Sequence, residues 1–205
     1  MTKLPKPVTA KGADAHLETR DRILEAGTEL ILGRGFSAVG LTEILGRAQV
    51  PKGSFYYYFD SKEDFGVALL ERYFQHYDAA VVRLLNDSST SGRERLQHYF
   101  NIWVDLHGRS ACLAVKLCGE VCDLSEAMRK ALSTGMTRMV SRIAATVQAG
   151  VADGSLAAVP DSHGLAEALY AMWMGGALLA RVHRSIAPFQ GCYAQTEVLL
   201  GPSRH

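Results

Sequence analysis

The sequence predicts an all-α protein, with a three-helix module containing a helix-turn-helix at the N-terminus and a larger helical domain after it. Apolar residues recur at helical spacing in successive segments, with no alternating strand pattern and no internal repeat. Residues 36–62 have the pattern of two short helices joined by a tight turn. The polar cluster DSSTSG at 87–92 separates these segments from a second apolar-periodic group. Together these observations predict about nine helices.

Composition limits the class of protein. The chain has 205 residues, of which 48% are hydrophobic, enough for a small module plus a larger core. Its formal net charge of +1 means that any DNA affinity must come from a local patch. No apolar run reaches the roughly 18 residues of a membrane span, and no signal peptide opens the chain. We therefore expect a soluble cytoplasmic protein without membrane contact.

Cysteine spacing argues against a metal centre or a disulfide framework. The four cysteines lack CxxC spacing and a secretory context; they are Cys112, Cys118, Cys122 and Cys192. Standard zinc-binding spacing is also missing. We expect free thiols, and neither a metal nor a cofactor.

The chain begins with a segment that lacks periodicity. Residues 1–16 contain proline, lysine and alanine, and we expect them to form a disordered arm that either contacts DNA through its lysines or is a solvated tail. Thr19 is the predicted N-cap of the first helix, which ends near Gly33 and Gly35. The DNA-binding module is predicted to span residues 17–62.

Two short helices follow, separated at Pro51. The first buries one face, formed by Ile44, Leu45 and Ala48. Pro51 disfavours helical geometry at the preceding Val50 and is suited to the first turn of the next helix. Phe55 and Phe59, four residues apart, are predicted to anchor that second helix in the core.

The residues between these two anchors are predicted to face solvent. They present an ammonium, a hydroxyl and two phenols: Lys52, Ser54, Tyr56 and Tyr57. Gly53 lacks a side chain and permits close approach of another backbone. A short helix of this chemistry suits the major groove of DNA.

A long connecting helix is predicted over about residues 61–86. Ser61 is its N-cap, and Asp64, three residues later, is a weaker form of the capping box. Helices continue beyond the loop at 87–92. We therefore assign residues 63–205 to a second, larger helical domain.

The helix-turn-helix stretch resembles the N-terminal signature of TetR-family transcriptional regulators. The matching residues are Phe36, Ile44, Ala48, Val50, Gly53, Phe55, Tyr56, Tyr58, Phe59, Ser61 and Lys62. The resemblance implies an all-α homodimer that binds a pseudo-palindromic double-stranded DNA operator. It implies that residues 63–205 are the effector-sensing and dimerisation domain. It implies base-reading roles for Lys52, Ser54 and Tyr57. It implies phosphate contacts for Tyr56 and Lys62, with Thr42 as a further DNA-binding candidate.

A narrower resemblance is to the NemR-type repressors, in residues 111–129 and 168–185. These repressors sense electrophiles and hypochlorous acid through a cysteine and control detoxifying reductases. The resemblance implies that Cys112 is the sensor. The first turn of a helix favours the reactive thiolate, and Arg109 and Lys116 would add positive potential. Arg181 replaces the family's lysine; its guanidinium is a poor nucleophile for a bond to oxidised cysteine, although it can stabilise a thiolate.

Cys118 and Cys122 are four residues apart and share one helix face. We expect burial beside Leu117 and Val121 to make both thiols inert.

Dimerisation is predicted through the last two helices. The residues proposed for the interface are Trp173, Gly175, Gly176 and Ala177, because small residues permit close helix approach and tryptophan supplies apolar area. Packing of the same residues inside one chain is the alternative.

Two other functions remain open from the sequence. The first is induction by a small hydrophobic ligand without covalent chemistry. Its pocket would be lined by Met128, Met136, Met139, Met172, Met174 and Trp173, although such stripes are more often core. The second is a thiol-dependent enzyme using Cys112 and His107, which would need an acid–base constellation that the sequence lacks. We therefore predict a regulator and not an enzyme.

Overall fold

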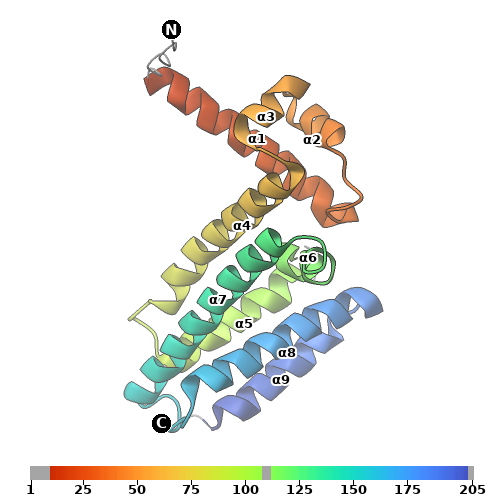
Figure 1. Ribbon diagram of the computed structural model, residues 1–205. Coiled ribbons are helices and arrows are strands. Elements are labelled where there is room, and N and C mark those ends of the chain that lie inside the picture. The colour runs from red at the N-terminus through yellow and green to blue at the C-terminus, as the bar shows by residue number, and fades with distance from the viewer. Residues whose placement is uncertain (1–9, 108–111, 203–205) are drawn as a thin grey trace. The chain divides into compact units, whose positions relative to one another are not determined.

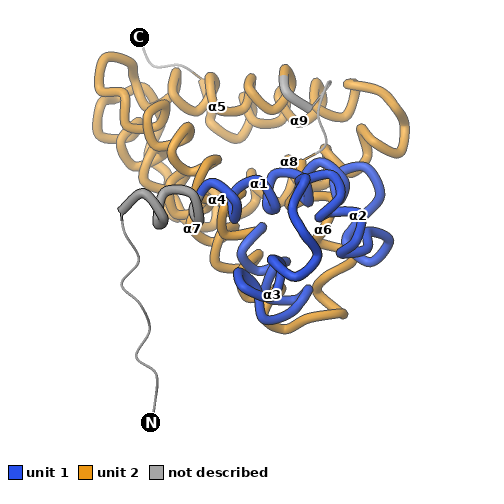
Figure 2. Tube along the Cα trace, turned by 90° about the horizontal axis from the view of Figure 1, so that it is seen from above, with its two compact units in different colours: residues 1–69 blue, residues 70–205 orange. Residues whose placement is uncertain are grey.

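The computed structural model describes residues 10–107 and 112–202, and every regular element within these ranges is helical (Figure 1). This confirms the predicted all-α class. The chain divides between Leu69 and Leu70 into two compact units, which Figure 2 distinguishes by colour. Unit 1 contains the helix-turn-helix, and unit 2 contains the later helices.

Within its described residues, unit 1 contains three α-helices, a short 3-10 helix and the start of a fourth α-helix. These are α1 (Ala10–Arg34), α2 (Leu41–Ala48), η1 (Lys52–Ser54), α3 (Phe55–Tyr58) and the first part of α4 (Lys62–Leu85). The expected start of the first helix at Thr19 is wrong, because α1 already includes Ala10. Its first turns are rich in alanine and contain no proline, so nothing stops the helix from beginning earlier. Residues 1–9 of the predicted arm lie outside the described ranges.

Three aromatic rings form the centre of unit 1. Phe55 and Phe59 are buried as predicted, with ring centroids 5.2 Å apart, and Phe65 of α4 lies 5.8 Å from Phe55. Gly27 of α1 packs directly on Phe65, so a methyl group there would collide with the ring. The aromatic cluster therefore ties α3 to both α1 and α4.

The turn between α2 and η1 is held by Arg22, a side chain that no sequence motif indicated. Its guanidinium donates hydrogen bonds to the carbonyls of Ala48 (2.8 Å) and Gln49 (3.1 Å). Gln49 has a left-handed backbone with φ of 55°, which ends α2 before Pro51. The arginine satisfies carbonyls that the helix leaves unpaired, and so fixes where the next element begins.

The predicted cap of α4 is confirmed. The Asp64 amide donates to the hydroxyl of Ser61 (3.0 Å), and the Asp64 carboxylate accepts from the amide of Asp60 (3.2 Å). These two bonds satisfy orphan amide groups at the start of the helix. The helix then continues without a break to Leu85.

The described part of unit 2 contains five further helices. They are α5 (Gly92–His107), α6 (Leu113–Val121), α7 (Glu126–Ala152), α8 (Ser162–His183) and α9 (Ala187–Leu200). Helix α7 packs on α5 and α8, and α9 packs on α8 and α5 (Figure 1). Side chains of Ser125 and Asp161 cap the two long helices α7 and α8.

The core of unit 2 is built around Trp173 of α8. Its side chain is fully buried; the ring stacks on Phe100 at 4.8 Å and lies 5.9 Å from Phe189. The indole Nε1 donates to the hydroxyl of Thr196, 2.9 Å away on α9. Trp173 is therefore a core residue of one protomer, and its prediction as an interface residue is wrong.

The small residues beside Trp173 also serve packing within the chain. Gly176 faces the Cys192 sulfur of α9, and Ala177 is buried. Close helix approach occurs as predicted, but the helix that approaches is α9 of the same chain. Of the four predicted interface residues, Gly175 alone is exposed.

No helix within the described residues is both long enough and apolar enough to cross a membrane.

Candidate functional site

The face of η1 and α3 that the sequence predicted to meet DNA is open. Tyr56 and Tyr57 are 65% and 66% exposed, and Lys52 is exposed beside them. Such exposure is unusual for aromatic side chains and leaves both phenol rings available to a partner. Thr42 is exposed on α2, whereas Ser54 is half-buried.

Lys62 is not a free cation of this surface. Its ammonium donates to the carbonyl of Phe36 at 2.9 Å and lies 4.8 Å from the centroid of the Phe36 ring. These contacts fasten the start of α4 to the segment before α2. Lys62 therefore has a positioning role that the sequence did not indicate. An ammonium has three N–H donors, and the phosphate contact of Lys62 stays a prediction.

Gly53 lies in η1, where an added methyl group would have no non-neighbouring heavy atom of the described chain within 4 Å. The glycine is therefore not required for packing within the protein. We expect Gly53→Ala to change the free energy of unfolding by less than about 1 kcal/mol. If the DNA backbone approaches Gly53, the added methyl group should weaken operator binding by clearly more than about 1 kcal/mol. Thermal unfolding and DNA titration of the same sample measure both quantities; unchanged affinity would exclude close approach at this residue.

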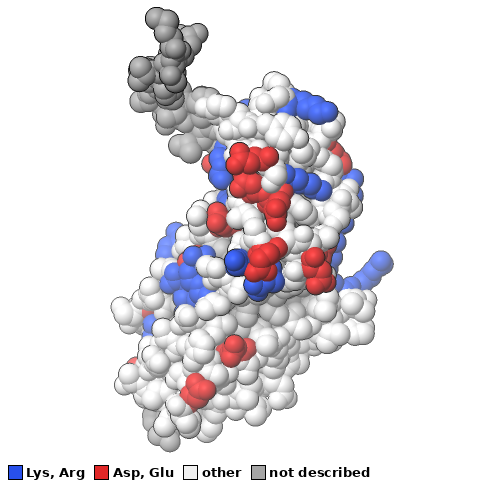
Figure 3. Space-filling view, in the orientation of Figure 1, with Lys and Arg blue, Asp and Glu red and all other residues white. Residues whose placement is uncertain are grey.

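The charged side chains do not form one uniform basic surface on the face seen in Figure 3, where Lys and Arg alternate with Asp and Glu. Several arginines of unit 1 are paired with acids. Arg47 contacts Glu29 at 2.7 Å, and Arg34 contacts Glu43. These exposed pairs neutralise part of the basic charge of unit 1, so we expect any DNA contacts to depend on particular residues such as Lys52.

The predicted sensor thiol lies at the start of α6. Cys112 is the N-cap residue and not part of the first helical turn; its side chain makes no capping hydrogen bond. The residue is only 9% exposed, and its sulfur lies 3.2 Å from the hydroxyl of Tyr73 on α4. Burial, and then the neighbouring Cys112, raise the pKa of Tyr73 well above its usual value.

Phenol groups surround this thiol, a feature that the sequence did not reveal. The Tyr77 hydroxyl donates to that of Tyr99 at 3.1 Å, and burial raises the pKa of Tyr99 to about 12. Burial is also the main cause that raises the pKa of Tyr170. The phenols therefore remain neutral at physiological pH and present hydroxyl groups in an otherwise apolar interior. The four-residue spacing of Tyr73 and Tyr77 was the only local signal for this cluster.

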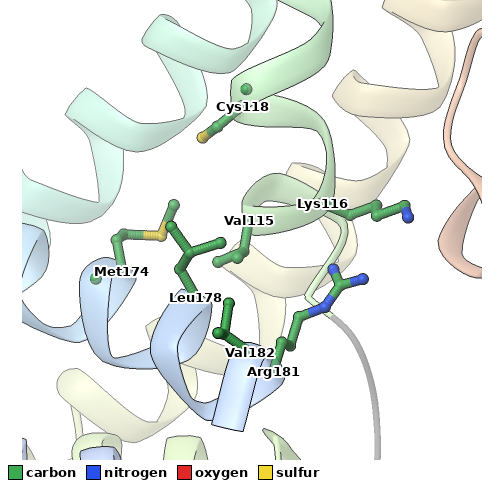
Figure 4. Close-up of a pocket in the computed structure, with 9 residues that line it drawn as sticks. Val115, Lys116, Cys118, Met174, Leu178, Arg181 and Val182 are labelled. Carbon is green, nitrogen blue, oxygen red and sulfur yellow. The ribbon is translucent and has the colours of Figure 1, made fainter.

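The cations expected around Cys112 are placed differently. Arg109 lies outside the described residues. Lys116 and Arg181 line a cavity of about 770 Å³ that also includes Cys118 but not Cys112 (Figure 4). Both side chains thus line an open pocket on α6 and α8, and their support of the Cys112 thiolate stays a prediction.

The remaining cysteines differ in environment. Cys122 is exposed, so the expectation that burial makes it inert is wrong. Cys118 is half-buried, and burial raises its pKa to about 11, which agrees with the low reactivity expected of it. The helix ends at Val121, which leaves Cys122 at the C-terminal turn and open to solvent. Cys192 is buried, and its thiol donates to the carbonyl of Met172 at 3.5 Å.

Comparisons with known proteins agree with this architecture. The model for bacterial regulatory proteins of the tetR family matches residues 23–69, and that for the tetracyclin repressor-like C-terminal domain matches residues 92–195. The HTH-type transcriptional repressor NemR of Escherichia coli (strain K12) is 38% identical over 187 residues, which cover 89% of this chain and 94% of NemR. The transcriptional regulator AcuR of Cereibacter sphaeroides is 34% identical over 182 residues, covering 87% of this chain and 83% of AcuR.

A solved structure extends the likeness to three dimensions. The crystal structure of reduced E. coli NemR superposes with a TM-score of 0.85 at 37% identity, over 91% of this chain and 97% of that one. The matched proteins are named as regulators, which fits the exposed helix-turn-helix of unit 1. With its helix-turn-helix and its C-terminal helical domain both matched, the chain belongs to the TetR family of transcriptional regulators and is a repressor similar to NemR.

Proposed function

We propose that the protein is a dimeric repressor that leaves its operator when an electrophile or oxidant modifies Cys112. The observation that carries the proposal is the contact between the Cys112 sulfur and the Tyr73 hydroxyl, 3.2 Å apart, at the junction of α6 and α4. The similarity to NemR supports a repressor of this kind. Genes for detoxifying reductases are the targets that this resemblance implies.

Modification of Cys112 would displace its neighbours. The thiol is 9% exposed and closely surrounded, so an attached maleimide or an oxidised sulfur does not fit without movement. Tyr73 is one of the groups that must move, and it belongs to α4. Helix α4 begins at Lys62, directly after the DNA-binding elements, and is continuous through Tyr73 to Leu85.

This helix is the covalent route from the thiol to the DNA-binding elements. A shift or tilt at Tyr73 would be passed along α4 as a rigid element and would change the placement of η1 and α3 against their half-site. DNA is released if the modified state binds the operator less well than the reduced state. The reactive form of the thiol is the thiolate, which forms the S–C bond with a Michael acceptor.

Dimerisation would use the exposed faces of the last two helices. Their exposed large apolar side chains are Leu178, Leu179 and Val182 on α8 and Val198 and Leu199 on α9. Apolar side chains gathered in this way favour burial against a second copy. Two copies would then bind half-sites about 34–36 Å apart on a pseudo-palindromic operator.

The test is a mobility-shift titration on DNA from upstream of the protein's own gene. Wild type and Cys112→Ser are treated in parallel with N-ethylmaleimide and hypochlorous acid. We expect each reagent to release the wild type from DNA and to leave Cys112→Ser bound. Release of Cys112→Ser should require a reagent concentration at least about tenfold higher. Cys192→Ser is the matched control, because it replaces a buried thiol elsewhere in unit 2 and should behave as the wild type. Equal release of Cys112→Ser would contradict the proposal.

A second candidate is induction by a non-covalent hydrophobic ligand. The cavity of about 770 Å³ supports it, because apolar side chains of Val115, Met174, Leu178 and Val182 line it. Such an inducer would act equally on the wild type and on Cys112→Ser in the same titration. That outcome would favour the pocket over the thiol as the sensing site.

A further inference from the structure

Two thiols that the proposed function does not use lie near the C-terminal end of α6. Cys118 and Cys122 are four residues apart, and the backbone of Cys122 is still helical, with φ of −63° and ψ of −32°. Residues at this spacing lie on one helix face, with Cβ atoms about 5–6 Å apart. Burial first, and then the neighbouring Cys122, raise the pKa of Cys118 to about 11.

Both thiols line the same cavity, of about 420 Å³, between α6, α7 and α8. One part of its wall is apolar and consists of Leu132, Met136, Val140, Tyr170 and Ala171. The rest of the wall is polar and consists of Arg129, Ser133, Thr137, His163 and Glu167. Cys118 also lines the neighbouring pocket, to which Lys116 and Arg181 contribute (Figure 4). The dithiol thus adjoins a partly apolar cavity of the size that small ligands occupy.

The helix geometry decides which chemistry suits this pair. A disulfide requires Cβ atoms about 3.5–4.5 Å apart, closer than helical i,i+4 positions allow. A single atom placed between the sulfurs removes that conflict. Among the described residues no group of three or more His, Cys, Asp and Glu is placed to hold a metal ion, so the pair lacks the four-ligand shell of zinc. In a trivalent organoarsenical, arsenic has one bond to an organic group and can form its other two bonds to two thiol sulfurs. It can therefore bridge the pair without any further protein ligand.

We propose that Cys118 and Cys122 form a dithiol site for trivalent organoarsenicals, whose organic group enters the apolar part of the cavity. An organoarsenic oxide condenses with both thiols. Two S–H bonds and the As–O bonds break, two S–As bonds form, and one water leaves with both protons. Arsenic stays trivalent and neither sulfur is oxidised, so no further reactant is needed. Soft thiol ligands suit this soft centre.

The two-point attachment gives the site its selectivity. Once one sulfur is bonded, the second attacks at a high effective concentration, which strengthens binding by about 10²–10⁴ over a single thiol. A simple alkylating agent gains nothing from the second sulfur. The high pKa of Cys118 keeps its thiol protonated at neutral pH, so alkylation of that residue is slow. The two-point attachment therefore favours arsenicals over alkylating agents, which bond to one sulfur at a time.

The experiment uses phenylarsine oxide on full-length Cys112→Ser protein, so that neither DNA release nor the proposed sensor enters the result. We expect one phenylarsenic group per chain by native mass spectrometry, with the mass of one water lost. Free thiols should fall from three to one, because three of the four cysteines remain in this variant. The adduct should survive excess glutathione and be removed by 2,3-dimercaptopropanol.

Single replacements then locate the two sulfurs. Adding Cys122→Ser or Cys118→Ser should each lower retention of phenylarsenic in glutathione by at least about a hundredfold. Adding Cys192→Ser should not, since that thiol lies between α8 and α9. Cys122 is exposed, so its replacement leaves the fold intact, and circular dichroism checks each variant. The proposal would be overturned if Cys112→Ser failed to retain phenylarsenic. It would also be overturned if the variants that lack Cys118 or Cys122 retained phenylarsenic as Cys112→Ser does.

Discussion

Replacement of Trp173 by alanine is expected to lower the free energy of unfolding by about 3–5 kcal/mol. The indole is fully buried, stacks on Phe100 and Phe189, and donates a hydrogen bond to Thr196. Truncation leaves a cavity between α5, α8 and α9 and removes the donor that faces the Thr196 hydroxyl. Urea denaturation followed by circular dichroism measures the effect at fixed protein concentration, because the proposed dimerisation would couple stability to concentration.

Thr134→Ala is the matched control, an exposed site on α7 where truncation should change stability by no more than about 0.5 kcal/mol. Analytical sedimentation of both variants measures their oligomeric state, and so distinguishes a core role of Trp173 from a role in the dimer interface. If Trp173→Ala kept wild-type stability but dissociated into monomers, the tryptophan would belong to the dimer interface as the sequence suggested. Loss of stability in the monomer itself places it in the core.

Replacement of Lys52 by alanine is expected to weaken operator binding by about 1–3 kcal/mol at each half-site. Lys52 is exposed at the start of η1, beside the two exposed phenols, and is predicted to contact base edges. A base-reading lysine contributes to the operator more than to random DNA. The ratio of operator to random-DNA affinity should therefore fall, as fluorescence anisotropy on both DNAs at one salt concentration would reveal.

Tyr56→Phe is the informative comparison, because it removes only the hydroxyl of a residue predicted to contact phosphate. This change should weaken binding to operator and to random DNA by a similar factor, and so leave the ratio of the two affinities unchanged. Lys130→Ala removes an equally exposed positive charge from α7 in unit 2 and should alter neither affinity appreciably. If Lys52→Ala left the ratio of operator to random-DNA affinity unchanged, Lys52 would contact the DNA backbone and not base edges.

The four cysteines of this chain differ in their surroundings, and these surroundings decide what each thiol can do. Cys112 is enclosed by phenols and contacts α4, which makes its modification a steric event. Cys118 and Cys122 share a cavity and can act as a pair. Cys192 fills the space beside Gly176 and is used for packing. The same side chain thus meets three different physical situations within one domain.

Local sequence was sufficient for the DNA-binding elements. Pro51 separates α2 from η1, Phe55 and Phe59 anchor the short helix, and Ser61 with Asp64 starts α4, as predicted. Each of these features depends on residues within about one helical turn, where backbone geometry and capping act. For the same reason the exposure of Tyr56 and Tyr57 followed from the position of the two phenylalanines.

The tertiary structure alone decided the partners of the residues that pack over long distances. Helical periodicity indicated that Trp173 and Gly176 lie on a buried face, but not that α9 of the same chain covers it. The thiol of Cys112 could not be matched to Tyr73, which lies on α4, nor Lys62 to the Phe36 carbonyl. A repeating pattern identifies the apolar side of a helix, whereas its neighbour is chosen by the packing of all the helices together.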